Sequence, residues 1–520
     1  MGLDFKTFLL YARLLFDMTV DFFFSLYWDR KRRPIPDLDK RHELLTESAV
    51  TLAEKIRSKQ LKSEDLVKAV IERIKEVNPI IHAVATERYE LALQEAREVD
   101  ELIAAGLPED IASKKPFLGV PFTTKESQAV KGLPFTLGLW ARRDKLASED
   151  SEAIVRLKEA GAIVVAATNL PELLVWQETR NPVYGMTKNP HHTGRTPGGS
   201  SGAEASLTAS YATTVSLCSD LGGSTRMPAF YCGMFGHHPT PGTTNCKGVM
   251  FRKGDEESML SLGFISKHAE DLGPLTKIIA GDQAEMLKLD RDVHIKDIKF
   301  YYLETGRDRM LSSIRADLRG AMKRVITRLS QETTSSTTAP QPYYHEGFSH
   351  MYSIWKHWMT KEPEHLASMC TDGSGNANGL IELCKKALGM SNLCLFTIVR
   401  LIEEQYFPKV DGEWAEKLSK EMKADLFSKL GDNGVLLMPS APQPAPYHYS
   451  CFLRPYNFAY WAIVNALKCP ASQVPLGVNS QGLPLGIQVV ASPYNDALCL
   501  TVAKYLEKQF GGSVKACKVK

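Results

Sequence analysis

Residues 151–169 read SEAIVRLKEAGAIVVAATN, and this stretch combines a helical segment, a glycine turn and a buried strand. The apolar residues of its first half recur at helical spacing, whereas its second half is a short, almost continuous apolar run. Similar runs of strand length occur at 117–125, 434–440 and 483–491. Helical segments that alternate with such runs predict an α/β fold.

The composition is that of a globular chain of 520 residues, 44% hydrophobic and 24% charged. Its formal net charge of +3 is small for this length, so we do not expect a nucleic-acid-binding protein with a dense basic stripe. The ten cysteines include no C-x-x-C pair, which favours neither a zinc site nor a disulfide framework. Since no linker or internal repeat interrupts the later sequence, we predict one domain over residues 45–515.

The N-terminal residues 1–33 differ from the rest, because residues 5–28 form one hydrophobic run with few polar interruptions. A signal peptide is not expected, since the start is not basic and no A-x-A cleavage site follows. The spacing of the polar residues places them on one stripe of a helix. These residues are Lys6, Arg13, Asp17, Asp21 and Ser25.

Three interpretations of this helix stay open. It is long enough to span a bilayer, its aromatic residues suit insertion into the membrane interface, and it is also suited to docking on its own protein. We favour membrane attachment, with 1–33 as a membrane-associating helix and the proline-containing stretch 34–44 as a tether. The basic cluster Arg30–Arg33 then predicts that the following domain faces the cytoplasm.

The stretch SDLGGSTR at 219–226 places two glycines directly before a serine. Backbone N–H groups in such a loop can converge on the oxyanion that forms when a serine attacks an amide or ester. This pattern makes Ser224 a candidate nucleophile, although a single Gly-Gly-Ser run is more often a tight turn. Asp220 is predicted to support the loop by pairing with Arg226. The predicted oxyanion donors are the N–H groups of Leu221, Gly222, Gly223 and Ser224.

A second glycine- and serine-rich stretch, PGGSSGAEAS at 197–206, lies just upstream. It contains the G-x-S-x-G pattern of a nucleophile elbow, but that motif requires a preceding strand. The preceding residues NPHHTGRTP cannot form a buried strand, which argues against the elbow. What remains is a loop that can approach another backbone closely.

A serine nucleophile also needs a base, and the sequence offers two kinds. The pairs His191-His192 and His237-His238 lie near the serine loops, so a histidine base is not excluded, and a metal role for these pairs lacks supporting carboxylates. Lys125 ends the apolar run 117–125, where a solvated charge is unusual. A lysine base must be neutral, so its pKa has to fall from about 10.4 to about 7, which burial can achieve. A surface lysine is the alternative interpretation.

Several ordered motifs resemble the amidase signature family. Their spacing fits the family as well, since Ser200 follows Lys125 by 75 residues and Ser224 follows Ser200 by 24. The resemblance covers roughly residues 45–512. The motifs that carry it are TKES at 124–127, PGGSSGAEAS at 197–206, SDLGGSTRMPAF at 219–230, YGMTKNP at 184–190, RPYNFAY at 454–460 and LPLGIQVVA at 483–491.

The resemblance implies a fold and a set of residue roles. The implied fold is α/β, a mixed, twisted β-sheet covered on both faces by α-helices. Ser224 is implied as the acylated nucleophile, Ser200 as a bridging serine on a cis peptide bond, and Lys125 as the base. The resemblance implies no cofactor and no metal.

Departures from the family pattern leave the three predicted catalytic residues intact. Ala203 replaces a usual glycine, Thr225 replaces a usual aliphatic residue, and His238 stands where many members have lysine. The stretch LGFISK at 262–267 also lacks a usual Gly-Pro-Met-Arg motif. We therefore expect activity, with substrate placement as the open question.

The sequence thus predicts a membrane-associated hydrolase of fatty-acid amides, with a lipid amide substrate and a membrane as its partners and no nucleic acid. The alternatives are an amidase or esterase for small or non-lipid substrates, and a catalytically silent lipid-binding member of the fold. A penicillin-binding-type site at Ser353–Lys356 is disfavoured, because no K-T-G or S-D-N motif follows. A homodimer is left open. So is the region 330–430, which forms either a substrate-facing region or an outer layer.

Overall fold

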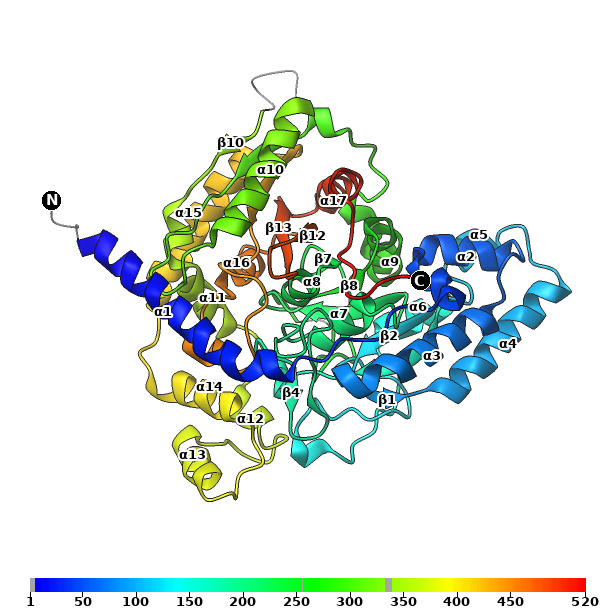
Figure 1. Cartoon of the computed structure of the whole chain (residues 1–520), viewed down its shortest axis with the longest axis horizontal. Helices are drawn as coiled ribbons and strands as arrows, with labels where there is room; N and C mark the ends of the chain where they lie inside the picture. The colour runs from blue at the N-terminus through cyan, green and yellow to red at the C-terminus, as the bar shows by residue number, and fades with distance from the viewer. Residues whose placement is uncertain (1–4, 255, 333–338) are drawn as a thin grey trace.

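The computed structural model describes residues 5–254, 256–332 and 339–520, and for residues 5–10 it describes the backbone only. One mixed sheet runs through the domain in the order β1-β3-β2-β6-β8-β7-β12-β13-β11-β9-β10 (Figure 1). Its strands are β1 Val84–Glu87, β2 Pro121–Lys125, β3 Ile163–Thr168, β6 Val215–Asp220, β7 Phe235–His238, β8 Ser261–Ser266, β9 Lys299–Tyr302, β10 Gln341–Pro342, β11 Gly434–Pro439, β12 Ala471–Val478 and β13 Pro484–Ala491. A separate pair joins β4 Arg180–Asn181 to β5 Gly185–Met186.

Helices cover both faces of this sheet, as the α/β prediction requires. Strands β2, β3, β6 and β11 are buried at every residue. Because successive side chains point to opposite faces of a strand, complete burial means that both faces are covered. The described helices are α1 Phe5–Trp28, α2 Ala49–Arg57, α3 Ser63–Ile81, α4 Tyr89–Ala105, α5 Ile111–Lys114, α6 Glu152–Glu159, α7 Gly202–Ala209, α8 Arg226–Cys232, α9 Leu272–Ala280, α10 Ala316–Glu332, α11 Met351–Met359, α12 Leu366–Met369, α13 Gly379–Ala387, α14 Leu395–Tyr406, α15 Gly412–Leu430, α16 Ala459–Ala466 and α17 Asp496–Phe510.

The stretch 151–169 folds as the sequence predicted. Helix α6 ends at Glu159, Gly161 turns the chain with a φ of +88°, and strand β3 follows. Strand β2 pairs in parallel with both β3 and β6, whereas β6 pairs antiparallel with β8. The sheet is therefore mixed, and the ends of β2 and β6 lie side by side where the predicted catalytic loops begin.

Helix α1 lies along the outside of the domain (Figure 1). The contacts of Arg13 and Asp21 show that its polar stripe faces the domain. The Arg13 guanidinium donates to the Ser312 hydroxyl at 3.1 Å. Asp21 accepts from the guanidinium of Arg454 at 2.8 Å. Lys6 lies outside the described side chains. The docked arrangement left open by the sequence is thus present, and it uses the polar face of the helix.

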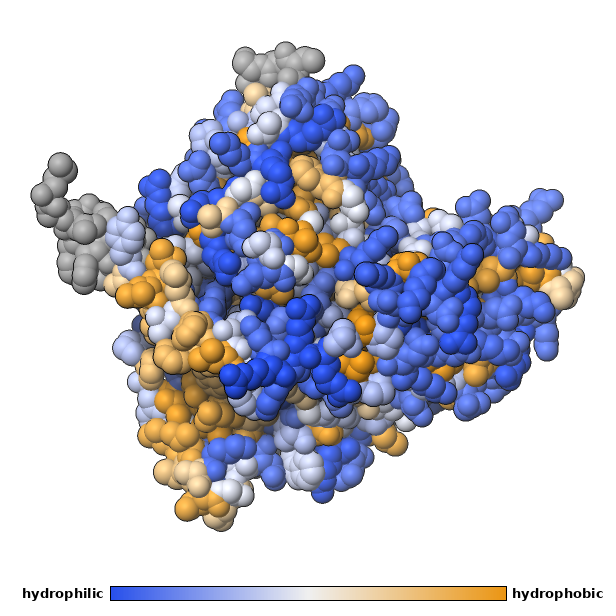
Figure 2. Space-filling model, viewed as in Figure 1, coloured by the Kyte–Doolittle hydropathy of each residue, from blue (hydrophilic) through white to orange (hydrophobic). Residues whose placement is uncertain are grey.

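The apolar face of α1 points away from the protein. Figure 2 shows this hydrophobic surface, which continues toward the region of α12, α13 and α14. In the described part of the chain, no helix is long and apolar enough to cross a membrane. The exposed apolar face consists of Tyr11, Leu14, Leu15, Phe16, Met18, Phe22, Phe23, Leu26 and Tyr27, between 41% and 65% exposed.

The predicted tether, 34–44, lies against the domain. Leu38 is fully buried, and its N–H donates to the carbonyl of Lys518 at 2.8 Å. Further along, the short 3-10 helix Lys40–Thr46 buries His42, whose Nε2 lies 2.9 Å from a carboxylate oxygen of Glu72. The segment is packed onto the domain, and the division at residues 33 and 44 stays a prediction.

Candidate active site

Lys125 is the last residue of strand β2, and its side chain is fully buried. Its Nζ lies 2.6 Å from Oγ of Ser200, 3.0 Å from Oγ of Ser201 and 3.1 Å from Oγ of Ser219. Burial lowers the pKa of this amine, since a charged ammonium loses its hydration there. A neutral amine has two N–H donors and one lone pair, so three hydroxyl groups are enough to satisfy it. The surface-lysine interpretation is therefore wrong.

Ser200 reaches Lys125 from the loop that precedes α7. The Gly199–Ser200 peptide bond is cis, as the family resemblance implied. Gly199 packs closely against the backbone of Trp176, because a Cβ built on this glycine would stand 2.3 Å from the Trp176 carbonyl oxygen. The Ser201 N–H donates to the carbonyl of Ser224 at 3.0 Å, which ties the two serine loops together.

Ser224 lies between strand β6 and helix α8, and it lines the same pocket as Ser200. In the part of the chain that the structure describes, no hydrogen bond joins the hydroxyls of Ser200 and Ser224. Lys125, Ser200 and Ser224 are thus brought to one place. Their catalytic roles stay predictions.

The backbone before Ser224 divides its N–H groups between two directions. The N–H of Gly223 donates to Oδ1 of Asp220 at 2.7 Å, so this amide is already engaged. Leu221, Gly222 and Ser224 line the pocket, whereas Gly223 does not. The geometry therefore favours Leu221, Gly222 and Ser224 as oxyanion donors, and the role of all four stays a prediction.

Asp220 and Arg226 form the buried pair that the sequence predicted. The guanidinium donates from Nε and from Nη2 to the two carboxylate oxygens, at 3.0 Å each. Although burial alone would raise it, Arg226 and His238 hold the pKa of the Asp220 carboxyl well below its usual range. Further bonds from Arg226 to Gln488 and Asn465, at 2.7 and 2.6 Å, anchor the loop to β13 and α16.

The histidine alternative gains no support from the structure. Burial lowers the pKa of His191 to about 4 and that of His238 to about 3, so both rings are neutral. The two ring nitrogens of His237 contact Asp496 at 3.2 Å and the Ser472 hydroxyl at 2.9 Å, and neither partner belongs to the serine loops. Across the described residues, no histidine hydrogen-bonds to Ser200 or Ser224, and no group of three or more metal-ligating side chains is present.

Above the serines lies a pocket of about 770 Å³. Helix α11 forms one wall, and its Trp355 donates from Nε1 to the carbonyl of Leu221 at 3.1 Å. Residues of α11, α12 and α14 line the pocket, so parts of the region 330–430 form its wall. Its apolar lining includes Leu174, Trp176, Met227, Trp355, Met359, Leu366, Met369, Val399, Ile402, Phe407, Phe452 and Phe458.

One wall of this pocket carries a charged cluster that the sequence did not reveal. The Lys356 ammonium lies 3.2 Å from a carboxylate oxygen of Glu403, and the Arg400 guanidinium donates to the Tyr352 hydroxyl at 3.1 Å. The three ionic side chains come from α11 and α14. They add charge to a lining that is mainly apolar but also includes polar residues such as His365 and Glu404.

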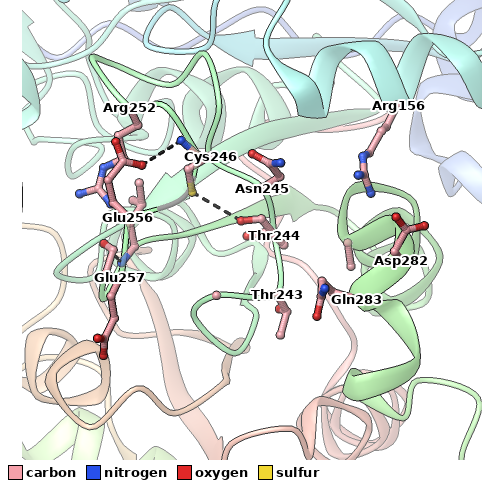
Figure 3. A pocket seen from close by; sticks show the side chains of 15 residues that line it. Arg156, Thr243, Thr244, Asn245, Cys246, Arg252, Glu256, Glu257, Asp282 and Gln283 are labelled. Carbon is pink, nitrogen blue, oxygen red and sulfur yellow. Dashed lines mark hydrogen bonds between the residues drawn. The ribbon is translucent and has the colours of Figure 1, made fainter.

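A second pocket of about 410 Å³ lies away from the serine loops (Figure 3). It is lined mainly by polar side chains, among them Arg156, Thr243, Asn245 and Asp282, and it shares only Leu260 with the first pocket. Lys125, Ser200, Ser219 and Ser224 are not among the residues that line this second pocket. No step of the chemistry is assigned to it.

Lys125 and the two serine loops thus meet in one α/β domain, and a family model described as Amidase matches residues 65–500. The chain therefore belongs to the amidase signature family. It is 40% identical over 485 residues to fatty-acid amide hydrolase 2 of Homo sapiens, covering 91% of this chain and 90% of that protein. It is 36% identical to fatty-acid amide hydrolase 2-A of Danio rerio, covering 94% of this chain and 93% of that protein.

Solved structures share the fold. A structure titled fatty acid amide hydrolase superposes with a TM-score of 0.71 at 20% identity, covering 95% of this chain and 89% of that one. A 6-aminohexanoate cyclic dimer hydrolase superposes with a TM-score of 0.70 at 20% identity, covering 90% and 97%. The predicted amidase-signature fold is confirmed.

Proposed function

We propose that this chain hydrolyses fatty-acid amides through an acyl-enzyme on Ser224. The observation that carries the proposal is the contact of 2.6 Å between Lys125 and Ser200 next to a largely apolar pocket of about 770 Å³ that Ser200 and Ser224 line. An apolar pocket of this size favours an acyl chain. Similarity to fatty-acid amide hydrolase 2 supports the same substrate class.

The proposed reaction begins with Ser224 attacking the amide carbonyl. Its proton passes to Ser200, whose own proton passes to the neutral Nζ of Lys125. The N–H groups of Leu221, Gly222 and Ser224 stabilise the oxyanion. The C–N bond then breaks, and the proton returns from Lys125 through Ser200 to the leaving amine. Water next attacks the ester on Ser224 by the same relay, and the fatty acid leaves.

We also propose that the apolar face of α1 rests in the membrane interface. The polar side of the helix is fixed to the domain by Arg13 and Asp21, so the apolar side cannot turn inward. A lipid surface suits this face, because aromatic side chains stand next to the basic cluster Arg30–Arg33. Such placement brings a membrane-dissolved amide close to the pocket. We propose as well that the domain lies on the cytoplasmic side of the membrane.

The test is hydrolysis of oleoyl amide, oleoyl ester and a short-chain amide by the wild type and by Ser224→Ala. We expect the wild type to cleave oleoyl amide faster than the short amide, and Ser224→Ala to cleave none. A fluorophosphonate probe should label only the wild type. Cleavage of the short amide or the ester alone would refute the lipid-amide assignment while keeping the serine chemistry. An unlabelled wild type would indicate a silent lipid-binding protein.

A further inference from the structure

A buried glutamate, Glu204, lies one contact away from Lys125 and has no role in the relay described above. Its partner Thr168 is the residue of β3 that pairs with Lys125 of β2. Glu204 lies in the first turn of α7, and its side chain is fully buried. The Thr168 hydroxyl, on β3, lies 2.8 Å from Oε1 of Glu204. The other carboxyl oxygen, Oε2, is buried and has no hydrogen-bond partner.

The hydrogen-bond donors available around Glu204 indicate its protonation state. The Thr168 hydroxyl has one proton, and it also lies 3.1 Å from the carbonyl of Thr124. A carbonyl only accepts, so both contacts of Thr168 are satisfied only when Glu204 supplies a proton of its own. An ionised Glu204 would instead be a buried carboxylate whose donors are its own backbone N–H and the Thr168 hydroxyl, which is shared with the Thr124 carbonyl, and its Oε2 would have no partner. Such burial of a charge is unfavourable.

Glu126 provides the contrast within the same molecule. Burial raises the pKa of both glutamates to about 7, so burial does not distinguish them. Their hydrogen-bond partners distinguish the two glutamates. Glu126 accepts from the N–H groups of Thr136 and Leu137 and from the Tyr184 hydroxyl. Three donors suit a carboxylate, whereas the surroundings of Glu204 suit a carboxylic acid.

We propose that Glu204 is a protonated, neutral carboxylic acid in the active protein and thereby keeps Lys125 uncharged as the base. An ionised Glu204 would hold the proton on Lys125 as an ammonium, because opposite charges in a buried site stabilise each other. The two arrangements contain the same number of protons and differ only in where one proton lies. This inference rests on the role proposed for Lys125.

The other groups that face this site do not supply a competing charge. On β6, burial raises the pKa of the Cys218 thiol well above its usual range, so it stays neutral. Asp220, also on β6, is ionised but is paired with Arg226. The N-terminus of α7 favours an anion at Glu204, but this effect is smaller than the cost of burying an unpaired carboxylate.

Infrared spectroscopy tests the protonation of Glu204 without requiring hydrolysis. At neutral pH, the wild type should show the carbonyl stretch of a protonated carboxylic acid, and Glu204→Gln should lose it. The matched control Glu126→Gln should retain it. The absence of this band from the wild type, or its loss only in the Glu126 variant, would overturn the proposal whether or not fatty-acid amides are the substrate.

The pH dependence of kcat/KM tests the effect on Lys125. If Glu204 is neutral, Glu204→Gln leaves the acid limb where the wild type has it and changes kcat little. If Glu204 is ionised, removing its charge lowers the pKa of Lys125 and moves the acid limb down by about 1–3 pH units, which would overturn the proposal. Should Glu204→Gln fail to fold, Glu204→Met serves the same comparison.

Discussion

The floor of the active site and helix α1 both turn charged side chains toward the protein, but they surround them differently. Lys125, Asp220 and Arg226 are fully buried, and the sheet and its helices cover them on every side. In α1 the charged residues also face inward, yet the aromatic and aliphatic residues behind them face outward. The charged side chains of the active-site floor are thus buried on all sides by the chain itself, whereas α1 contacts the protein through its polar face only.

This difference in burial indicates which contacts determine the contribution of each region. At the active-site floor, each group is placed by close contacts within the chain, so small changes should alter chemistry. On α1 the ring contacts of exposed side chains such as Phe22, Phe23 and Tyr27 are with neighbours in the same N-terminal segment, so the contribution of this face should depend on the surface against which it rests. Substitutions in the two regions should therefore separate turnover from membrane binding.

After the complete loss expected for Ser224→Ala, the largest effect is expected for Lys125→Ala. Loss of a general base costs about 10²–10⁴-fold in rate, and the residual acylation should depend on hydroxide and rise more steeply with pH. Burial lowers the pKa of Lys125, so the wild type should retain activity at a pH well below that of an ordinary lysine. Stopped-flow acylation across pH measures this.

The control for Lys125→Ala is its binding to membrane vesicles, which should equal that of the wild type because α1 is untouched. A variant with an unchanged pH–rate profile would contradict lysine as the base. A variant that no longer binds vesicles would contradict the separation of the two regions.

Gly223→Ala should have the next largest effect. Gly223 has a φ of +106°, and a Cβ there would stand 2.3 Å from Cβ of Trp461, so the loop before Ser224 must shift. A shift of about 1 Å near the reacting atoms costs on the order of 10²-fold in kcat/KM. The matched control is Gly242→Ala, because Gly242 has a φ of +89° but open space around it.

Both glycine variants carry the strain of a left-handed alanine, about 1–2 kcal/mol of unfolding free energy. Only Gly223→Ala should also lose kcat/KM, which steady-state kinetics and thermal unfolding together resolve. Equal activity in the two variants would show that the close fit at Trp461 does not hold the nucleophile loop.

Much of the fold was open to prediction because its inner strands are buried on both faces. Such strands appear in the sequence as continuous apolar runs, and the runs at 117–125, 434–440 and 483–491 contain β2, β11 and β13. Lys125 was conspicuous for the same reason, as a charge that ends a buried run. Local composition therefore indicated both the buried strands and the unusual position of Lys125.

Other features depend on contacts between distant residues and were not predictable. Nothing in SDLGGSTR shows that the N–H of Gly223 turns toward Asp220 instead of the pocket. Ser219 reaches Lys125 only because β2 and β6 are neighbours in the sheet. The stripe on α1 was visible in the sequence, but its inward direction depends on Ser312 and Arg454, far along the chain.

The smallest effect on turnover is expected for the double substitution Phe22→Ser, Phe23→Ser on α1. These rings are 59% and 63% exposed, so removing them should cost little folding free energy. If these rings enter the membrane interface, each contributes roughly 1.5 kcal/mol to binding, and one ring alone changes vesicle partitioning about tenfold.

The control Asp21→Asn weakens the contact with Arg454 and keeps the apolar face, so it should bind vesicles like the wild type while exposing α1 to proteolysis. Cosedimentation with vesicles of neutral and anionic lipid measures both variants. Wild-type binding by the double variant would show that another surface meets the membrane, and weakened binding by Asp21→Asn would show that the docking of α1, beyond its apolar face, sets how the protein meets the lipid.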